Sequence, residues 1–297
     1  AGRVIATFLE PMKNLLGGGD EATGFRMTMA IFAVASIALF WICFATTKER
    51  VRVIPVKTDV RGDLRALINN GPWIALFAAA IFTLMNVAVR NGTLLYYFKY
   101  YVKADETPLF LIFNKTAVFM SLGLFTMLIG IALTSTLCKY FEKRALLIAL
   151  TILNAISMAL FYITPPDQYW LIVLINCIGT FVNGPTPALV WSMYTDTADY
   201  CEWKTGRRIT GLTFSSLQFA QKLGLAVGAG LTGIILGWFG FVANEMQTPE
   251  SLAGIRFLFS VMPAALAVAG AMAIFFYKIN SETIRAFERD LQERHAT

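Results

Sequence analysis

Seven long apolar segments set the strongest limit on what this chain can fold into. They lie near residues 25–45, 73–98, 109–138, 145–163, 169–194, 209–239 and 254–277. An α-helix needs about 20 mostly apolar residues to cross the hydrocarbon core of a bilayer. Of the 297 residues 57% are hydrophobic and 15% are charged, whereas soluble domains contain roughly 45–50% and about 25%. Because a backbone in lipid must satisfy its own hydrogen bonds, the sequence predicts an all-α polytopic membrane protein.

The order of the segments predicts the domain organisation. Residues 1–16 run apolar into the turn GGGDEATG and have no initiator methionine, so we expect an N-terminally truncated fragment that begins inside a further span. Residues 1–45 would hold the end of that helix and a complete second one. A loop at 46–71 would lead to a six-helix bundle at 72–278. We expect residues 279–297 to form an amphipathic tail helix, with Ile284, Phe287 and Leu291 on one side.

The positive charges follow the predicted topology. Sixteen of the 25 Lys and Arg residues lie in alternate connections and in the tail, at 46–71, 139–144, 195–209 and 278–297. The other connections contain only Lys99, Lys103 and Arg256. By the positive-inside rule, the basic connections and the C-terminus are expected on the cytoplasmic side of a plasma (inner) membrane. The net charge of +6 therefore indicates topology, not binding to nucleic acid.

Lys222 is the residue that most clearly suggests a functional site. No ionisable residue occurs in the thirteen positions before it or the twenty-two after it. A cation inside a membrane helix is costly and usually faces a bundle interior or a wet cavity. Ser215 and Gln218 share its helix face by their spacing. We expect these three residues to line a substrate or cation pathway; the alternative is that Lys222 forms a structural ion pair between two halves of the protein.

Gly224, Gly228, Gly233 and Gly237 form two GxxxG patterns on the same segment. Such patterns allow helices to approach closely. We expect both to serve packing.

A helix break is predicted in the sixth segment, at Asn183-Gly184-Pro185-Thr186-Pro187. Two prolines interrupt the hydrogen-bonding pattern there. Broken backbone at membrane depth occurs where it is buried in protein or lines a cavity. Asn183 is therefore a candidate pathway residue, and a packing kink is the alternative.

Arg90, inside the third segment, has two interpretations. It either pairs structurally, with carbonyl groups or with an acid of the missing half, or it belongs to the pathway. The aromatic residues that follow it are expected to form an interfacial belt: Tyr96, Tyr97, Phe98, Tyr100 and Tyr101.

A run of charges precedes the segment of Lys222. Asp196, Asp199 and Glu202 alternate with Lys204, Arg207 and Arg208. We expect Asp196, Asp199 and Glu202 to pair with Arg208 and with cations of the other half, as a latch that closes one side of the protein.

The sequence does not favour an enzyme or a channel. There is one histidine, His295, and we find no HExxH or GxSxG motif and no pair of carboxylates at membrane depth. No metal site or organic cofactor is predicted. A pore would show a repeated polar ring along a span, and only scattered polar positions occur.

The stretches DTADYCEWKTGRR, SSLQFAQKLG and NGTLLYYFKYY resemble the glycoside-pentoside-hexuronide:cation symporters, the melibiose-permease-like branch of the major facilitator superfamily. The resemblance covers the whole chain. It implies a fold of twelve helices in two halves, of which this chain would contain the end of helix 5, helix 6, the middle loop and helices 7 to 12. It further implies symport of a sugar, a glycoside, pentoside or hexuronide, with Na⁺ or H⁺ by alternating access.

The resemblance also assigns roles to single residues. Lys222 matches the cavity-facing lysine of helix 11, and Gln218 a cavity-lining position one turn earlier. Asp196, Asp199, Glu202 and Arg208 match the cytoplasmic charge network. The aromatic residue of helix 10 aligns with Pro187, so Trp191, one turn later, is expected to supply the sugar-stacking surface. The cation-binding carboxylates of the family lie on helices that this chain lacks.

Two alternatives remain open at this point. The first is a carrier of lysolipids or other amphiphiles with the same fold. The second, less favoured, is a membrane scaffold or sensor that transports nothing.

Overall fold

The computed structural model describes residues 21–48, 60–104, 114–206 and 209–296. The chain divides into two units, residues 1–58 and 59–297. The first unit contains one described helix, α2 (Glu21–Thr46), most of whose side chains are exposed. The unit boundary falls inside the predicted 46–71 loop, so the short helix α3 (Val60–Ile68) belongs to the second unit.

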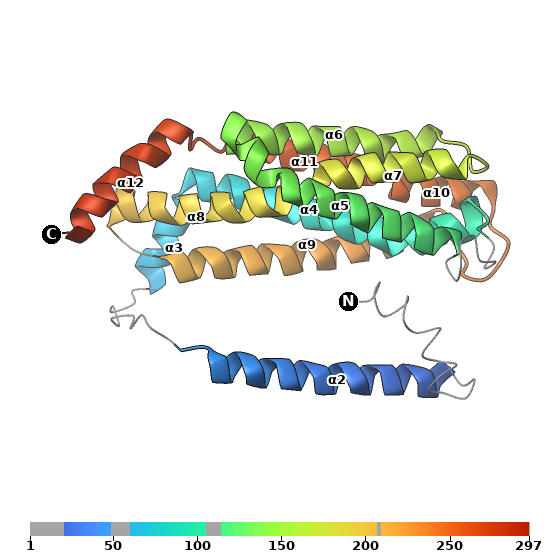
Figure 1. The fold of residues 1–297 in the computed structure, drawn as a ribbon. Coiled ribbons are helices and arrows are strands. Elements are labelled where there is room, and N and C mark those ends of the chain that lie inside the picture. The colour runs from blue at the N-terminus through green and yellow to red at the C-terminus, as the bar shows by residue number, and fades with distance from the viewer. Residues whose placement is uncertain (1–20, 49–59, 105–113, 207–208, 297) are drawn as a thin grey trace. The chain divides into compact units, whose positions relative to one another are not determined.

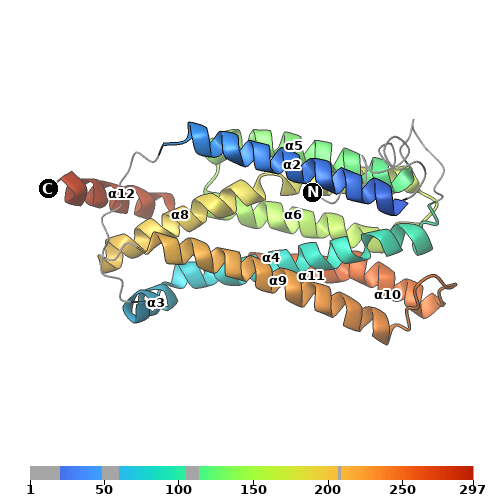
Figure 2. The same cartoon turned by 90° about the horizontal axis from the view of Figure 1, so that it is seen from below.

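The second unit consists of helices that run alongside one another (Figures 1 and 2). After α3 come α4 (Gly71–Tyr96), which continues as the π-helix η1 (Tyr97–Tyr101), then α5 (Lys115–Tyr140) and α6 (Lys143–Ile163). The remaining helices are α7 (Tyr169–Asn183), α8 (Thr186–Thr205), α9 (Thr210–Trp238), α10 (Pro249–Phe259), α11 (Val261–Phe275) and α12 (Ser281–Ala296). The described residues contain seven helical stretches that are long and apolar enough to cross a membrane, as predicted.

Local sequence signals explain where the helices begin. The Asn70 side chain accepts a hydrogen bond from the Trp73 N–H (3.4 Å) at the start of α4, and Pro72, which has no N–H, needs no acceptor there. Asn114 caps α5 in the same way, through the Ala117 N–H (2.9 Å). These caps satisfy backbone donors that helix termini leave without partners.

Helix α4 is central to the second unit and packs mainly against α9 and α11. Helix α6 packs against α11 and α7, and α7 also packs against α5. Small residues permit the α4–α9 contact. A Cβ atom on Gly224 would come within 2.6 Å of the Ile81 carbonyl oxygen, and one on Gly228 within 2.7 Å of the Met85 carbonyl oxygen. The first GxxxG pattern therefore serves packing, as predicted.

The second GxxxG pattern does not. A Cβ atom on Gly233 or Gly237 would meet no atom within 4 Å in the described part of the chain. Both glycines lie on the exposed side of α9, whereas the first pair lies on the side that faces α4. The prediction of a packing role for this pair is wrong for the described structure.

Two spans of the described structure are interrupted. The predicted break in the sixth segment is present between α7 and α8. A second break, at Ser260 (φ −122°, ψ −72°), divides the last span into α10 and α11, where we expected one continuous helix over 254–277. Pro263 lacks the N–H that would bond to the preceding turn. The α4 side chain of Asn86 covers this region and donates to the Pro263 carbonyl (2.9 Å).

The aromatic residues at the end of α4 only partly fit the predicted belt. Tyr97 and Phe98 are fully buried. The Tyr97 ring stacks on Phe259, with 4.1 Å between ring centroids. The π-helix turns these side chains into the bundle, so the belt prediction is wrong for Tyr97 and Phe98.

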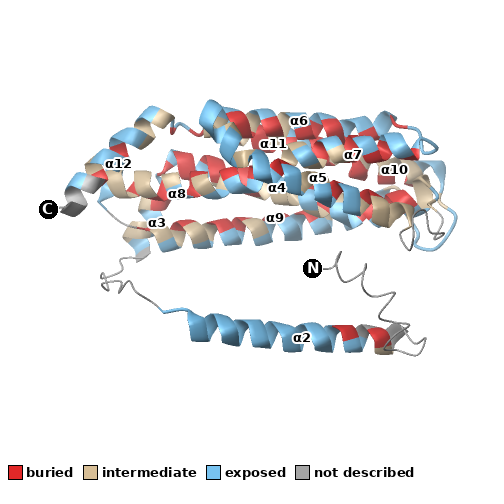
Figure 3. Ribbon diagram, viewed as in Figure 1, coloured by how far each residue is buried: buried red, intermediate tan, exposed pale blue. Residues whose placement is uncertain are grey.

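Within the second unit, three described elements that carry basic residues, α3, the end of α8 and α12, lie toward the same end (Figure 1). Phe287 and Leu291 of α12 are buried, which confirms the predicted amphipathic tail helix. Figure 3 shows buried and exposed residues alternating along the helices. Many of the exposed residues are large and apolar. Exposed apolar faces of this extent fit a protein whose solvent is lipid.

Candidate functional site

Helix α9 has two faces of opposite character. The buried residues recur every three or four positions and face α4: Thr213, Leu217, Ala220, Gly224 and Gly228. Ser215, Gln218 and Lys222 are exposed on the other side. The structure therefore brings the three predicted residues together on one exposed helix face.

Lys222 lies near the middle of α9. It is twelve residues after Thr210 and sixteen before Trp238, which corresponds to about 18 Å and about 24 Å of helix. Both distances exceed the reach of a lysine side chain. Within the described ranges, no hydrogen bond or ion pair engages the Lys222 ammonium group. A charge at such depth costs roughly 2.5–3.5 kcal/mol or more in lipid, so the position calls for a wet cavity or an anionic partner.

An aromatic surface lies beside the start of this face. The Trp191 ring of α8 stacks on Phe214 of α9, with 5.8 Å between ring centroids and 19° between planes. Trp191 remains 43% exposed. Phe214 lies one helical turn before Gln218 on α9, so the Trp191–Phe214 contact lies on the side of the helix that bears Gln218.

Asn183 is the last residue of α7, directly before the break that precedes α8, and is engaged in packing. Its side-chain oxygen accepts hydrogen bonds from Asn154 of α6 (3.4 Å) and from the Thr186 hydroxyl (3.1 Å). A Cβ atom on Gly184 would come within 2.6 Å of the Met127 carbonyl oxygen of α5. The break thus lies directly against another helix, which favours the packing interpretation for Asn183.

Arg90 joins several helices of the second unit. Its guanidinium carbon is 4.7 Å from the ring centroids of both Phe161 (α6) and Phe259 (α10). Its Nη2 donates to the Asn176 side-chain oxygen of α7 (3.3 Å), and Asn176 donates to the Phe119 carbonyl of α5 (3.1 Å). Desolvated cation–π contacts stabilise by about 2 kcal/mol. This geometry favours the structural interpretation of Arg90, with rings and an amide as partners. The sequence analysis did not identify Asn176 as a partner of Arg90. Its position as a polar amide within an apolar span could have indicated a buried hydrogen-bonding role.

Asp196 of the charge run forms an ion pair with a residue outside the run. The Asp196 carboxylate accepts from the Lys143 ammonium at 2.7 Å, and its side chain is 13% exposed. Lys143 begins α6, in the same unit. Asp199 and Glu202 are half-buried and have interactions of their own. Arg208 lies outside the described residues, so its predicted pairing stays a prediction.

The tail helix also contacts this end of the bundle. Trp203 Nε1 of α8 donates to the Asp290 carboxylate of α12 (2.8 Å). Lys143 and Asp290 were not singled out from the sequence. Lys143 and Asp290 are each surrounded in the sequence by other charged residues, so sequence spacing could not show which of these charges forms the contact.

The described structure is thus a bundle of apolar helices long enough to span a membrane, with a cation at mid-depth on an exposed face of α9 and broken spans packed inside. Residues 1–281 match the family model described as MFS/sugar transport protein. The chain belongs to this family, which consists of transporters and not of enzymes.

Individual relatives agree with this assignment. The chain is 32% identical to the "Inner membrane symporter YicJ" of Escherichia coli over 99% of its length and 63% of that protein. It is 29% identical to the "Putative glycoside/cation symporter YagG" of Escherichia coli, covering 96% of this chain and 61% of the relative. It is 28% identical to the "Isoprimeverose transporter" of Lactiplantibacillus pentosus, covering 99% and 60%. The chain thus spans about three fifths of the length of these relatives.

Proposed function

We propose that the protein is a secondary active transporter that carries a sugar, of the glycoside, pentoside or hexuronide type, together with Na⁺ or H⁺ by alternating access. The observation that carries the proposal is Lys222, a cation at mid-depth on an exposed helix face. The names of the relatives support the substrate class, since one is a putative glycoside/cation symporter and another an isoprimeverose transporter.

The exposed α9 face has the chemistry for a sugar. Gln218 and Ser215 provide an amide and a hydroxyl, which can donate to and accept from sugar hydroxyl groups. The Trp191 ring offers a flat apolar surface for one face of a pyranose. Small-molecule sites commonly combine aromatic walls with a few placed polar groups. In this proposal Lys222 pairs with a carboxylate across the pathway, and a coupling cation competes for that carboxylate. Asn183 and Arg90 act as supports of the scaffold.

Transport in proteoliposomes tests the proposal. We expect the protein, in its full natural length, to accumulate a labelled glycoside or glucuronide when an inward Na⁺ or H⁺ gradient is imposed. Monensin or an uncoupler should abolish this accumulation. Movement of lysophospholipid with no movement of any sugar would establish the amphiphile carrier instead. Single cysteines at Thr205 and Asn244, in a cysteine-free background, report orientation in cells; we propose that Thr205 is labelled only from the cytoplasm and Asn244 only from outside.

We further propose that the charges at the end of α8 form a latch. Asp196 holds Lys143, and Asp199 and Glu202 complete the network with Arg208 and with cations of the other half. Contacts of this kind must break and re-form during switching.

Asp199→Asn is expected to slow transport several-fold and to leave substrate binding nearly unchanged, because the change affects the switching step and not the sugar site. Binding is measured by isothermal titration and transport by initial uptake rate. Asp167→Asn, an exposed carboxylate in the loop between α6 and α7, is the matched control and should change neither. Loss of binding with a normal rate of exchange in the remaining fraction would contradict the latch.

A further inference from the structure

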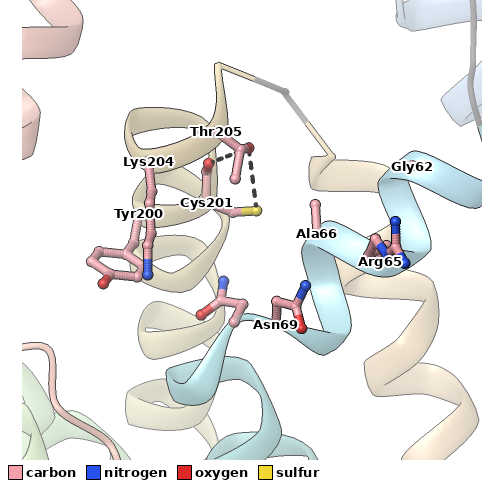
Figure 4. A pocket seen from close by; sticks show the side chains of 9 residues that line it. Gly62, Arg65, Ala66, Asn69, Tyr200, Cys201, Lys204 and Thr205 are labelled. Atoms are coloured by element: carbon pink, nitrogen blue, oxygen red, sulfur yellow. Dashed lines mark hydrogen bonds between the residues drawn. The ribbon is translucent and has the colours of Figure 1, made fainter.

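The last turns of α8, which carry the carboxylates of the proposed latch, are held from two sides. On one side Asn70, which caps α4, donates through its side chain to the Thr197 carbonyl of α8 (3.3 Å). A pocket of about 490 Å³ lies between α3 and this end of α8. Figure 4 shows that Cys201 points toward α3, whereas Tyr200 and Lys204 project away from it. The side of α8 that bears Tyr200 is therefore left for a second contact.

The tail helix α12 supplies the second contact. Its apolar side packs on the bundle, since Phe287 is 1% exposed and Leu291 9% exposed. One residue before Leu291, the Asp290 carboxylate accepts a hydrogen bond from Trp203 Nε1 of α8 (2.8 Å). The ring centroids of Trp203 and Tyr200 are 6.0 Å apart, so Trp203 lies near the side of α8 that projects away from α3. A hydrogen bond to a carboxylate is stronger than one between neutral groups.

Helical spacing places a latch carboxylate beside this contact. Asp196, Asp199 and Trp203 follow the i, i+3, i+7 spacing, so they share one face of α8. Asp196 accepts from the Lys143 ammonium of α6 (2.7 Å), and Trp203 donates to Asp290 of α12. Asp199 therefore lies between two fixed points, about one turn after the first and about one turn before the second.

Both fixed points are contacts within the second unit, because Lys143 and Asp290 belong to it. The partners proposed for Asp199 include cations of the other half. A contact between moving parts must break and re-form during switching, whereas a contact within one part can persist. The two fixed points can thus hold Asp199 in place while its own contacts change.

We propose that Asp290 is a positioning residue for the switching step of transport, a role that rests on the proposed latch. Through Trp203 it holds the last turns of α8 in the orientation that presents Asp199 to its partners. A pre-ordered side chain loses less conformational freedom when its contact forms. Loss of the Trp203–Asp290 bond should therefore slow switching and leave the sugar site unchanged.

Asp290→Ala in the full-length protein tests this role. Initial sugar uptake in proteoliposomes should be about fivefold slower, a factor that corresponds to one hydrogen bond of ordinary net strength. The dissociation constant of the sugar, measured by isothermal titration, should not change. Asp290→Asn should restore most of the rate, because its amide oxygen can still accept from the indole N–H.

Glu288→Ala is the matched control, since Glu288 is an exposed carboxylate on the same helix. It should transport at the rate of the unchanged protein. Equal slowing by Glu288→Ala and Asp290→Ala would overturn the proposal, and so would weaker sugar binding in Asp290→Ala.

Trp203→Phe tests the same bond from the other side, because it removes the donor and keeps an aromatic ring. It should slow uptake as Asp290→Ala does, and the double variant should be no slower than either single one, since both changes remove one interaction. Additive slowing would contradict the proposal. Thermal unfolding checks that each variant is folded, and if Asp290→Ala is not, the comparison of Trp203→Phe with the unchanged protein decides.

Hydrogen–deuterium exchange of the purified protein tests the contact separately from transport. Asp290→Ala should speed exchange at residues 199–206 and leave exchange along α9 unchanged; no change at 199–206 would overturn the positioning role. If the unchanged protein transports sugar and Asp290→Ala does so equally fast, the role of Asp290 is wrong and the proposed function stands. If the unchanged protein transports no sugar, both are wrong.

Discussion

Lys222→Ala should abolish accumulation of sugar against a gradient while the protein still reaches the membrane folded. The reason is the position of this residue: mid-depth in α9, exposed on the face away from α4, and without a partner in the described part of the chain. Because a charge at this depth is energetically costly, we expect Lys222 to act in the pathway. It would pair with a carboxylate that also binds the coupling cation. Accumulation is measured as the steady-state ratio of internal to external sugar in proteoliposomes with an imposed gradient.

Three comparisons sharpen this prediction. Lys222→Arg keeps the charge and should retain part of the activity, whereas Lys222→Met keeps the length and should not. Gln221→Ala, one residue away but turned toward a different side of α9, should accumulate sugar normally. If Lys222 served only a structural ion pair, its loss in Lys222→Ala would lower thermal stability together with activity. Wild-type accumulation by Lys222→Ala would refute the pathway role.

Gly228→Ala should destabilise the bundle, and Gly233→Ala should not. A methyl group on Gly228 would lie 2.7 Å from the Met85 carbonyl oxygen and 2.7 Å from Ala88 Cβ. Backbone atoms cannot rotate away, so α9 must move off α4. Overpacking of this kind costs about 1–3 kcal/mol. Chemical unfolding of the purified protein in mixed micelles measures the difference.

Gly233→Ala is the matched control because both glycines belong to GxxxG patterns on one helix. Its new methyl group meets nothing within 4 Å in the described structure. Alanine is a better helix former than glycine by up to about 1 kcal/mol, so the substitution should be neutral or stabilising. Equal destabilisation by the two variants would contradict the α4–α9 contact at Gly228 that this structure shows.

Much of the fold was predictable because the membrane imposes a simple rule. Segment length and hydropathy sufficed for the seven spans, and the i, i+3, i+7 spacing placed Phe287 and Leu291 inward in the tail helix. The prolines after Asn183 were sufficient to predict the α7–α8 break. Ser215, Gln218 and Lys222 were grouped correctly because helical periodicity alone sets which residues share a face.

The errors share a physical cause: each depended on a neighbouring helix that periodicity cannot identify. Only contact with α4 distinguishes Gly228 from Gly233, since their sequence pattern is the same. The π-helix turned Tyr97 inward, where Phe259 offered a ring to stack on. Asn176 as the partner of Arg90, and Lys143 as the partner of Asp196, lie 86 and 53 positions away in the chain.

The close contact between α4 and α9 restricts how the protein can change shape. Where two helices touch backbone to backbone through glycine, neither can slide or rotate on the other without collision, because interfaces without flexible side chains have no room for adjustment. The two helices must therefore travel as one rigid body. In the proposed transport cycle, the backbone that bears Lys222 would move with that body, and access to its ammonium group would depend on its side-chain rotamers and on the surface that approaches the exposed face of α9.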